Sequence, residues 1–339
     1  MSETGIGKDG YLKFQKETTY NTPATTGMEL MPAAEGQINS TIADIENSNI
    51  IGSRLKQAPC AGRISHSGEL TFSLYPNLLG MLLDIFIGGG TDVDNEDGSY
   101  THKWLTPLTG LATPNSFTAH QALGNDLAKV FSGGKITSIV MASDNEGNQT
   151  IQLNTFFKSA LYDQARHSTF LFDNVCAYRF GEIKVYITPE GGAEALYKAA
   201  SSELSIDLGY NTEDYKLGSF EIDSFKFNTA PTVSLSLNIP ADDAFLKAAR
   251  EKKSFAIRLA IESKQKVSES AQATAVYKTT IYLPGCRLSP DTEIPNGTEF
   301  INMDLSFDCS YGGTTPAAGT AKTMFEIDHT DSVESYSQS

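Results

Sequence analysis

The segment GELTFSLYPNLLGMLLDIFIG, Gly68 to Gly88, joins a strand pattern directly to a helix pattern. Leu70, Phe72 and Leu74 alternate with polar residues, and this period of two predicts a strand with one buried face. Pro76 stops the strand and suits the first turn of a helix. The residues that follow are apolar around most of the helix surface, so the helix should pack on more than one side before the glycines end it. We therefore expect a sheet or barrel that one short apolar helix plugs or flanks.

Composition predicts a substantial core and excludes nucleic-acid binding through phosphate neutralisation. The chain has 339 residues, of which 40% are hydrophobic and 20% charged, and this length suits two domains of ordinary size. The formal net charge is -15. Because a surface that grips phosphates must be basic, this acidic chain should repel polyanions.

Cysteine usage and the apolar runs predict a cytosolic product without a membrane segment. The first ten residues are polar and carry no secretion signal. The longest apolar run, Leu78 to Ile87, has about half of the residues that a membrane-spanning helix needs. No cysteine pair has zinc-ligand spacing, so we expect buried free thiols in a reducing compartment at Cys60, Cys176, Cys286 and Cys309.

Further strand patterns cover most of the chain. Lys135–Ser143 and Thr150–Phe157 flank a turn at Glu146-Gly147 and predict an antiparallel hairpin. Val233–Ile239 alternates strictly, and Pro240 ends it before an expected helix over residues 241–253. The pattern around Ile38–Ile45 favours a partly exposed strand. Residues from Gly312 onward are small and then acidic, which is typical of a mobile tail.

The two halves of the chain share an order of strand, proline and helix, which predicts an internal duplication. The offset between matched positions falls from about 165 to about 151 along the chain, as an insertion of about a dozen residues in the first copy would produce. The acidic hairpin DVDNEDG is the natural candidate for that insertion. The matches are Asn47 with Asn211 (offset 164), Gly52 with Gly218 (166), Gly68–Tyr75 with Pro231–Ile239, Pro76 with Pro240 (164), Gly134–Ser138 with Gly285–Ser289 (151) and Ile151–Leu153 with Met303–Leu305 (152).

No motif in the sequence predicts catalysis, and we expect no catalytic, cofactor-binding or metal-binding residue. The five histidines are scattered, and neither a zinc-binding helix, a P-loop nor a nucleophile elbow occurs. The alternating carboxylates of the acidic hairpin resemble a calcium loop, but Asp97 stands where that loop needs Gly and Lys103 where it needs a bidentate Glu. We interpret that hairpin as a solvated turn. The residues considered were Asp92, Asp94, Glu96 and Asp97 for calcium, and His66, His102, His120, His167 and His329 for other chemistry.

Taken together, these stretches resemble the tail tube proteins of long-tailed bacteriophages. GYLKFQKETTYNTPA resembles the family's opening arm, and SGELTFSLYPNLLGMLLDIFIGG the strand and helix of its first half. ELSIDLGYNTEDYKLGS followed by VSLSLNI resembles the second half. The similarity spans roughly residues 7 to 310 and is diffuse, because the family has no catalytic signature. The acidic hairpin at Asp92–Trp104 departs from the family pattern.

The resemblance implies a mainly β fold with short flanking helices, as two tandem tail-tube-type β-sandwich or barrel domains. It implies that subunits close rings with a β-lined channel, that rings stack through loops and the N-terminal arm, and that DNA passes through the channel without specific binding. A doubled chain would form a ring of three subunits, a pseudo-hexamer. The implied partners are further copies of the chain, the tape measure protein and the tail terminator and baseplate proteins, in a virion tail assembled in the host cytoplasm.

We expect four segments: an N-terminal extended arm (1–27), tube domain 1 (28–165), tube domain 2 (166–312) and a flexible C-terminal tail (313–339). Two alternatives remain open from the sequence. One is another phage component of related fold, such as a tail terminator, baseplate hub or head decoration protein. The other is an extracellular carbohydrate-binding or hydrolytic β-protein, which exposed aromatic rows would favour.

Overall fold

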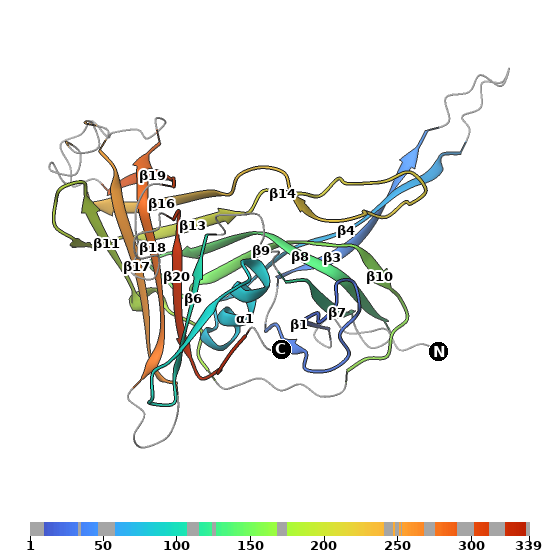
Figure 1. Ribbon diagram of the computed structural model, residues 1–339, viewed down its shortest axis with the longest axis horizontal. Coiled ribbons are helices and arrows are strands. Elements are labelled where there is room, and N and C mark those ends of the chain that lie inside the picture. The colour runs from blue at the N-terminus through green and yellow to red at the C-terminus, as the bar shows by residue number, and fades with distance from the viewer. Residues whose placement is uncertain are drawn as a thin grey trace.

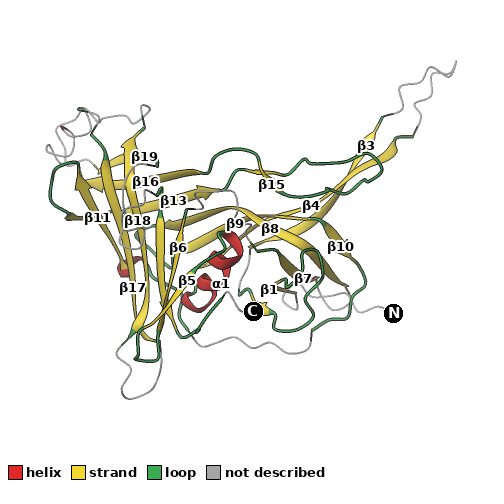
Figure 2. Cartoon of the chain, viewed as in Figure 1, coloured by secondary structure: helices red, strands yellow, loops and turns green. Residues whose placement is uncertain are grey.

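The structure is a computed structural model of the chain, and its strands dominate the fold (Figure 2). This confirms the mainly β prediction. The residues that the structure describes are 10–32, 35–46, 58–106, 115–123, 127–167, 175–240, 247, 251, 253–267, 275–289, 302–311 and 323–336.

The described strands and helices follow one another in this order along the chain (Figure 1): β1 (Tyr11–Lys16), β2 (Glu29–Leu30), β3 (Glu35–Ile45), β4 (Cys60–Ser73), α1 (Pro76–Phe86), β5 (Thr91–Asp94), β6 (Tyr100–Leu105), β7 (Phe117–Leu123), β8 (Leu127–Ser143), β9 (Thr150–Phe157), β10 (Ser159–Leu161), the 3-10 helix η2 (Phe180–Glu182), β11 (Ile183–Pro189), β12 (Ala195–Tyr197), β13 (Ser201–Asp207), β14 (Tyr210–Asn211), β15 (Lys226–Phe227), β16 (Thr232–Pro240), β17 (Phe255–Lys266), β18 (Val276–Leu288), β19 (Asn302–Cys309) and β20 (Glu326–Asp331).

The predicted strand–Pro–helix unit is present as β4 and α1. Tyr75 is extended, Pro76 occupies the first turn, and the helix buries residues on nearly all sides. Gly88 and Gly89 follow with φ of 72° and 66°, a left-handed conformation that residues with a Cβ rarely adopt. Within the described residues, no helix is long and apolar enough to cross a membrane. The helix expected at residues 241–253 lies largely outside the described residues.

Both halves of the chain have the same order of hydrogen-bonded strands. In the first half the order is β1-β7-β8-β9-β4-β3, and β10 also pairs with β8. In the second half it is β11-β17-β18-β19-β16-β13, and β20 also pairs with β18. In each half, the first strand also pairs with the short strand that follows it, β1 with β2 and β11 with β12. β5 and β6 have no counterpart among the described residues of the second half.

A single antiparallel layer joins the two halves. β8 is bent: its first part pairs with β7, and its last part pairs with β9 on one edge and β13 on the other. The strands β3-β4-β9-β8-β13-β16-β19 therefore form one continuous sheet, which we call the wall. In Figure 1 the wall strands run across the view and α1 lies below them. The predicted β8–β9 hairpin is confirmed.

Residues 11–16 of the expected N-terminal extended arm form a strand that packs against the body of the molecule. β1 pairs with β7 over six residues, and Leu12 and Phe14 are buried in the main core. Phe14 packs edge-on against Phe117, with ring centroids 4.8 Å apart. The segment GYLKFQK shows no clear alternation of polar and apolar residues, because Lys13 is buried together with its apolar neighbours. Residues 1–9, the rest of the expected arm, lie outside the described residues.

The prediction of a flexible tail over 313–339 is wrong for residues 323–336. β20 lies between β18 and β6, and Phe325 and Ile327 are fully buried. The acidic hairpin β5–β6 is confirmed, with Gly98 at φ 83° in its turn. Because β6 pairs with β20, this hairpin extends the sheet of the second half. The division near residue 165, which falls between β10 and β11, remains a prediction.

Candidate assembly surface

The wall has one apolar face and one polar face. Cross-strand partners share a face, so the register places Phe72, Ile151, Met141, Leu204, Leu235 and Phe307 in one buried row across six strands. The next row, on the opposite face, contains Thr71, Gln152, Val140, Ser205, Ser234 and Asp308. The β-period of these segments thus builds a sheet that is covered by the core on one side only.

The polar face is acidic. It carries exposed carboxylates on three strands, β4, β13 and β19, and the paired segments contain no lysine or arginine. Amide side chains hold some of these carboxylates across strands. Gln152 Nε2 donates to Glu69 Oε1 at 2.6 Å, and Asn238 Nδ2 donates to Asp304 Oδ1 at 2.6 Å. The segments are 67–73, 138–142, 150–154, 201–207, 232–238 and 304–308, and the carboxylates are Glu69, Glu203, Asp207, Asp304 and Asp308.

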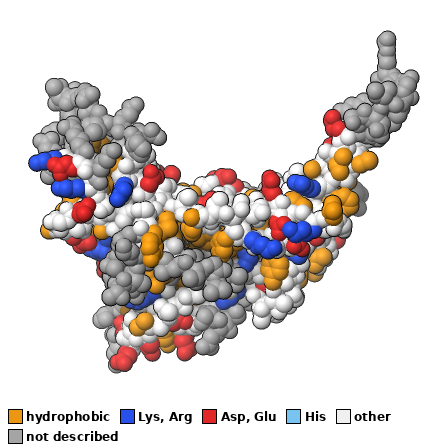
Figure 3. All heavy atoms as spheres, turned by 45° about the horizontal axis from the view of Figure 1, so that its top comes forward, with side chains coloured by type: hydrophobic (Ala, Val, Ile, Leu, Met, Phe, Trp, Pro, Cys, Tyr) orange, Lys and Arg blue, Asp and Glu red, His pale blue; other side chains and the backbone are white. Residues whose placement is uncertain are grey.

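The β3–β4 hairpin extends beyond the body of the molecule (Figure 1), and the outline is hollowed between this projection and the opposite end, where much of the surface is uncharged (Figure 3). A shallow hollow of about 430 Å³ lies over the β8–β13 joint and the adjacent ends of β16 and β19. Its lining includes Glu203 and Asp304 but no histidine, cysteine or lysine, so it contains no nucleophile–base pair of the usual kinds.

The first strand of the wall has an open edge. β3 pairs with β4 and, within the described residues, with no strand on its other side. Most of β3 is exposed as predicted, and Ile42 and Ile45 are 56% and 55% exposed. An exposed strand edge with apolar side chains is a template for pairing with another chain.

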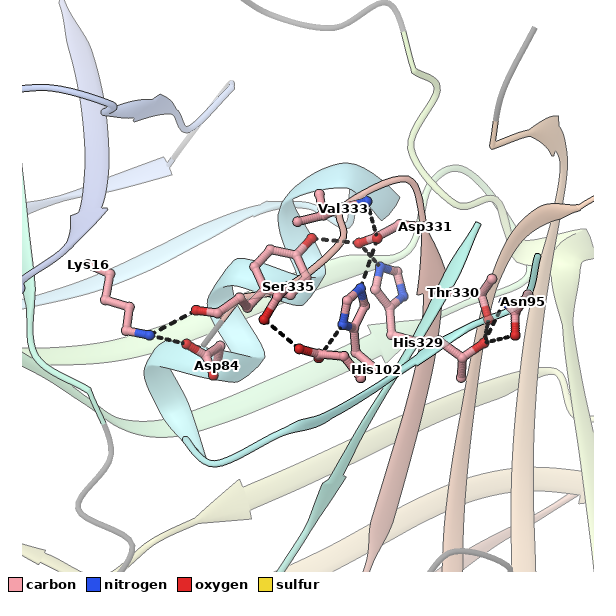
Figure 4. A network of polar contacts seen from close by, with 12 residues as sticks. Lys16, Asp84, Asn95, His102, His329, Thr330, Asp331, Val333 and Ser335 are labelled. Atoms are coloured by element: carbon pink, nitrogen blue, oxygen red, sulfur yellow. Dashed lines mark hydrogen bonds and ion pairs between the residues drawn. The ribbon is translucent and has the colours of Figure 1, made fainter. Parts of the chain in front are cut away.

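Away from the wall, a buried polar network ties the C-terminal residues to the first half (Figure 4). His102 lies between two carboxylates, with Nδ1 2.7 Å from Asp92 Oδ1 and Nε2 3.1 Å from Asp331 Oδ1. His329 Nε2 lies 3.3 Å from Asp331 Oδ2. The His102 side chain is fully buried, so no substrate can reach it. We call His102, Asp92, Asp331, Ser335 and Tyr336 the clasp.

The chain end completes this clasp. The Tyr336 hydroxyl donates to Asp331 Oδ2, and its ring lies against Gly80 of α1, where an added Cβ would overlap the ring. Lys16 Nζ donates to the Tyr336 carbonyl oxygen and to Asp84 Oδ2, both at 2.9 Å. Residues from β1, α1, β6 and β20 are therefore fixed together, and Gly80 is required by the approach of the tyrosine ring.

Electrostatics in the clasp favour a charged imidazole. Burial lowers the pKa of His102, but hydrogen bonds to Asp331 and Asp92 outweigh it, so the pKa is raised above 6.5. Burial alone would raise the pKa of Asp331, whereas its hydrogen bonds from His102 and His329 hold that pKa below its ordinary value. Because two carboxylates accept from one ring, both ring nitrogens carry protons.

The clasp should stabilise the fold most below neutral pH. A raised histidine pKa contributes stability that is complete below about pH 6.5 and is lost as the pH rises through the folded-state pKa. We expect the melting temperature of His102→Gln to lie several degrees below that of the wild type at pH 6, with the gap narrowing toward pH 9. Calorimetry from pH 5.5 to 9 measures this difference, and a gap that widens with pH would contradict the assignment.

His66→Gln is the matched control for that experiment. His66 is also buried, but burial lowers its pKa. Its protonation therefore disfavours the folded state, and the sign of the pH dependence is reversed. The wild type should lose stability relative to His66→Gln as the pH falls.

The carboxylates considered for calcium binding in the sequence are engaged in separate local contacts. Among the calcium candidates, Asp92 belongs to the clasp, Asp94 Oδ1 accepts from the Glu96 amide, and Asp97 Oδ1 accepts from the Ser99 amide and hydroxyl. Within the part of the chain that is described, no group of three or more His, Cys, Asp or Glu could hold a metal ion. These carboxylates thus act as turn and clasp acceptors.

The histidines form contacts that the sequence did not indicate, and the prediction for the cysteines is only partly confirmed. His102 and Trp104 lie on the same face of β6, with ring centroids 5.9 Å apart. The structure also brings His329 to Asp331 and His120 to within 4.4 Å of His167, pairings that no sequence spacing indicated. The prediction of buried thiols holds for Cys286 and Cys309, which face each other on β18 and β19, and is wrong for the exposed Cys60 and Cys176.

The sequence matches a known protein family over most of its length. Residues 7–310 match the model of a family described as phage tail tube protein. Among curated proteins, none matches this sequence. The matched region begins before β1 and ends just after β19, so it includes every strand of the wall.

Proposed function

Because this chain belongs to the phage tail tube protein family, we propose that it assembles with copies of itself into stacked rings that form the tail tube. The wall is the observation that carries this proposal: its polar face lines the channel, and its open edge at β3 joins the next subunit. A strand edge that is buried by a neighbour's edge no longer exposes unpaired backbone groups. The channel is the path of DNA during ejection.

We further propose that the chain is an internal duplication and that three chains close a ring with six tube domains. The equal strand orders support this, since β1 to β4 and β7 to β10 match β11 to β13 and β16 to β20 one by one. Register supports it too. Ser138 pairs with Asn154, and Ser289 N donates to Ser306 O at 2.8 Å, which repeats the offsets of 151 and 152 found in the sequence (289 − 138 and 306 − 154). The two domains then meet at the β8–β13 joint, with β1 and β20 as their first and last strands.

The charge of the polar face suits a channel for a polyanion. Carboxylates such as Glu203 and Asp304 repel phosphates, and the uncharged serines, threonines and amides between them offer no cation that would retain DNA. DNA therefore passes without specific binding. The chain's own chemistry adds nothing catalytic to this role, and we propose none.

The remaining partners follow from the place of a tube in a tail. The tape measure protein occupies the channel before ejection, and terminator and baseplate proteins cover the two ends of the tube. The chain is made and assembled in the host cytoplasm and ends in the virion tail. These assignments rest on membership of the family.

Electron microscopy of the purified chain tests the assembly directly. Without any ligand, negative-stained samples should contain rings or hollow tubes, and class averages viewed down the axis should have threefold symmetry with six similar lobes. Serum albumin at the same concentration serves as the control for stain artefacts. Chains that stay monomeric at all concentrations and salt conditions would contradict the proposal.

A further inference from the structure

The β8–β13 joint between the two halves shows which backbone groups of a wall strand form hydrogen bonds across such a joint. Ser202, Leu204 and Ile206 of β13 lie opposite Ser143, Met141 and Ile139 of β8. Leu208 N donates to Thr137 O at 3.1 Å, so the even-numbered residues of β13 direct their hydrogen bonds toward β8.

The offset of 164 transfers this pattern to β3. It relates Ser202, Leu204 and Ile206 to Ile38, Ser40 and Ile42. The backbone groups of these three β3 residues should thus point away from β4, toward the open edge. Ile38 bears this out, because its hydrogen-bond partner does not belong to β4.

That partner is a side chain. Gln121 of β7 accepts a hydrogen bond from Ile38 N at 2.8 Å and donates one to Ile38 O at 3.3 Å. A paired residue of a neighbouring strand makes these same two bonds. Gln121 is only 4% exposed, and it fills the position that Ser143 fills opposite Ser202.

We propose that the outer edge of β3 at Ser40 and Ile42 receives a strand of a second copy of this chain, and that Gln121 ends this ladder by occupying Ile38. The inference rests on the proposed function and specifies the register of its ring-closing joint. The β8–β13 joint is the template for the occupant, since it unites the same kind of edge within one chain. Within the described residues, the outward backbone groups of Ser40 and Ile42 have no partner in the subunit.

Energetics favour a stop over displacement of Gln121. An incoming strand that displaced the amide would replace two hydrogen bonds at Ile38 by two similar ones. It would also leave the buried Gln121 amide without hydrogen-bond partners. A buried polar group without a partner costs its full desolvation free energy, so displacement is unfavourable overall. The ladder therefore begins at Ser40, and a slip of two residues toward Ile38 is blocked.

Ser40→Pro and Ser40→Ala form a matched pair that tests the edge. Proline removes the outward N–H while the β4 side of the strand keeps its bonds, as at edge positions of natural sheets. Alanine keeps the N–H, and both variants lose the hydroxyl contact to His66 Nδ1. We expect the proline variant to remain folded by circular dichroism and to yield at least about tenfold fewer sedimentable tubes than the alanine variant.

The outcomes separate the two proposals. If the wild type forms no rings or tubes, the proposed function fails and the edge inference with it. If the wild type assembles and Ser40→Pro assembles equally well, only the edge inference is overturned. If Ser40→Pro does not fold, amide exchange of the wild type decides, as follows.

Hydrogen exchange of free subunits and tubes distinguishes capped from open positions. In free subunits the Ile38 amide should be protected, and the Ser40 and Ile42 amides should exchange quickly. In tubes all three should be protected. In free Gln121→Leu subunits, Ile38 alone should lose protection. Fast exchange at Ser40 and Ile42 in tubes, or protection of both in free subunits, overturns the docking edge, and an unchanged Ile38 in Gln121→Leu overturns the stop.

Discussion

A chain that ends at residue 322 is expected to lose cooperative folding. It lacks β20, and with it the fully buried Phe325 and Ile327. Burial of such side chains contributes about 1.5–3 kcal/mol each, while a whole domain is stable by only about 5–15 kcal/mol. The loss also opens two strand edges, because β20 separates β18 from β6. Aggregation through these edges should follow.

A chain that ends at residue 331 is the control for that truncation. It keeps β20 and loses Ser335 and Tyr336 of the clasp. We expect it to remain soluble, with a melting temperature below that of the full chain. Urea unfolding followed by tryptophan fluorescence measures both truncations, since Trp104 lies on β6 next to β20. A cooperative, wild-type-like transition for the chain ending at residue 322 would show that β20 is dispensable.

Reversing the charge of the wall is expected to make the tube retain DNA. Lysine at Glu69, Glu203 and Asp304 changes the formal charge of each chain from -15 to -9, because each of the three substitutions adds two positive units. All three positions are exposed on the polar face, on three different strands. With about three phosphates neutralised per chain, binding should fall steeply with salt, by a power of about 2.7 in salt concentration.

Cosedimentation of assembled tubes with short duplex DNA at 50 to 300 mM salt measures this retention. The control has the same charge change at three exposed turn or loop carboxylates, Glu96, Glu146 and Glu213, all outside the wall segments. Only the wall variant should carry DNA into the pellet, and a phage that bears it should eject its genome slowly. Equal retention by both variants would mean that the polar face does not line the channel.

Several strands of the wall could be predicted from the sequence because they obey one simple rule, whereas the β8–β13 joint could not. β9 and β16 each alternate buried residues with partly buried or exposed ones without interruption, so the period of two is readable from residue types alone. The junction between β4 and α1 was predicted correctly because the fixed backbone conformation of Pro76 ends the strand and starts the helix without tertiary contacts. The proposed duplication rests on the same kind of signal, since the residue offsets between the two halves persist where the order of strand, proline and helix is kept.

The clasp and the terminal strands could not be predicted in this way. In β20, Glu326, His329 and Asp331 are buried, and each is a residue type that normally signals exposure. These side chains can be buried because they pair with residues distant in the sequence, such as Asp331 with His102. Such pairs can be identified only from the three-dimensional structure. The alternation of Ile327 and His329 was the one available signal, and the surrounding acidic residues obscured it. Lys13 and Lys16 similarly obscure the burial pattern of β1 in the sequence.

The β8–β13 joint changes how ring formation depends on protein concentration. In a ring of three such chains, half of the domain contacts are already made when each polypeptide folds, and they need no encounter between molecules. The concentration of closed rings then rises with the third power of free subunit concentration, where six separate single-domain proteins would require the sixth. Tubes of this kind should therefore begin to grow in a cell that has made comparatively little of the protein, and their growth should tolerate dilution better.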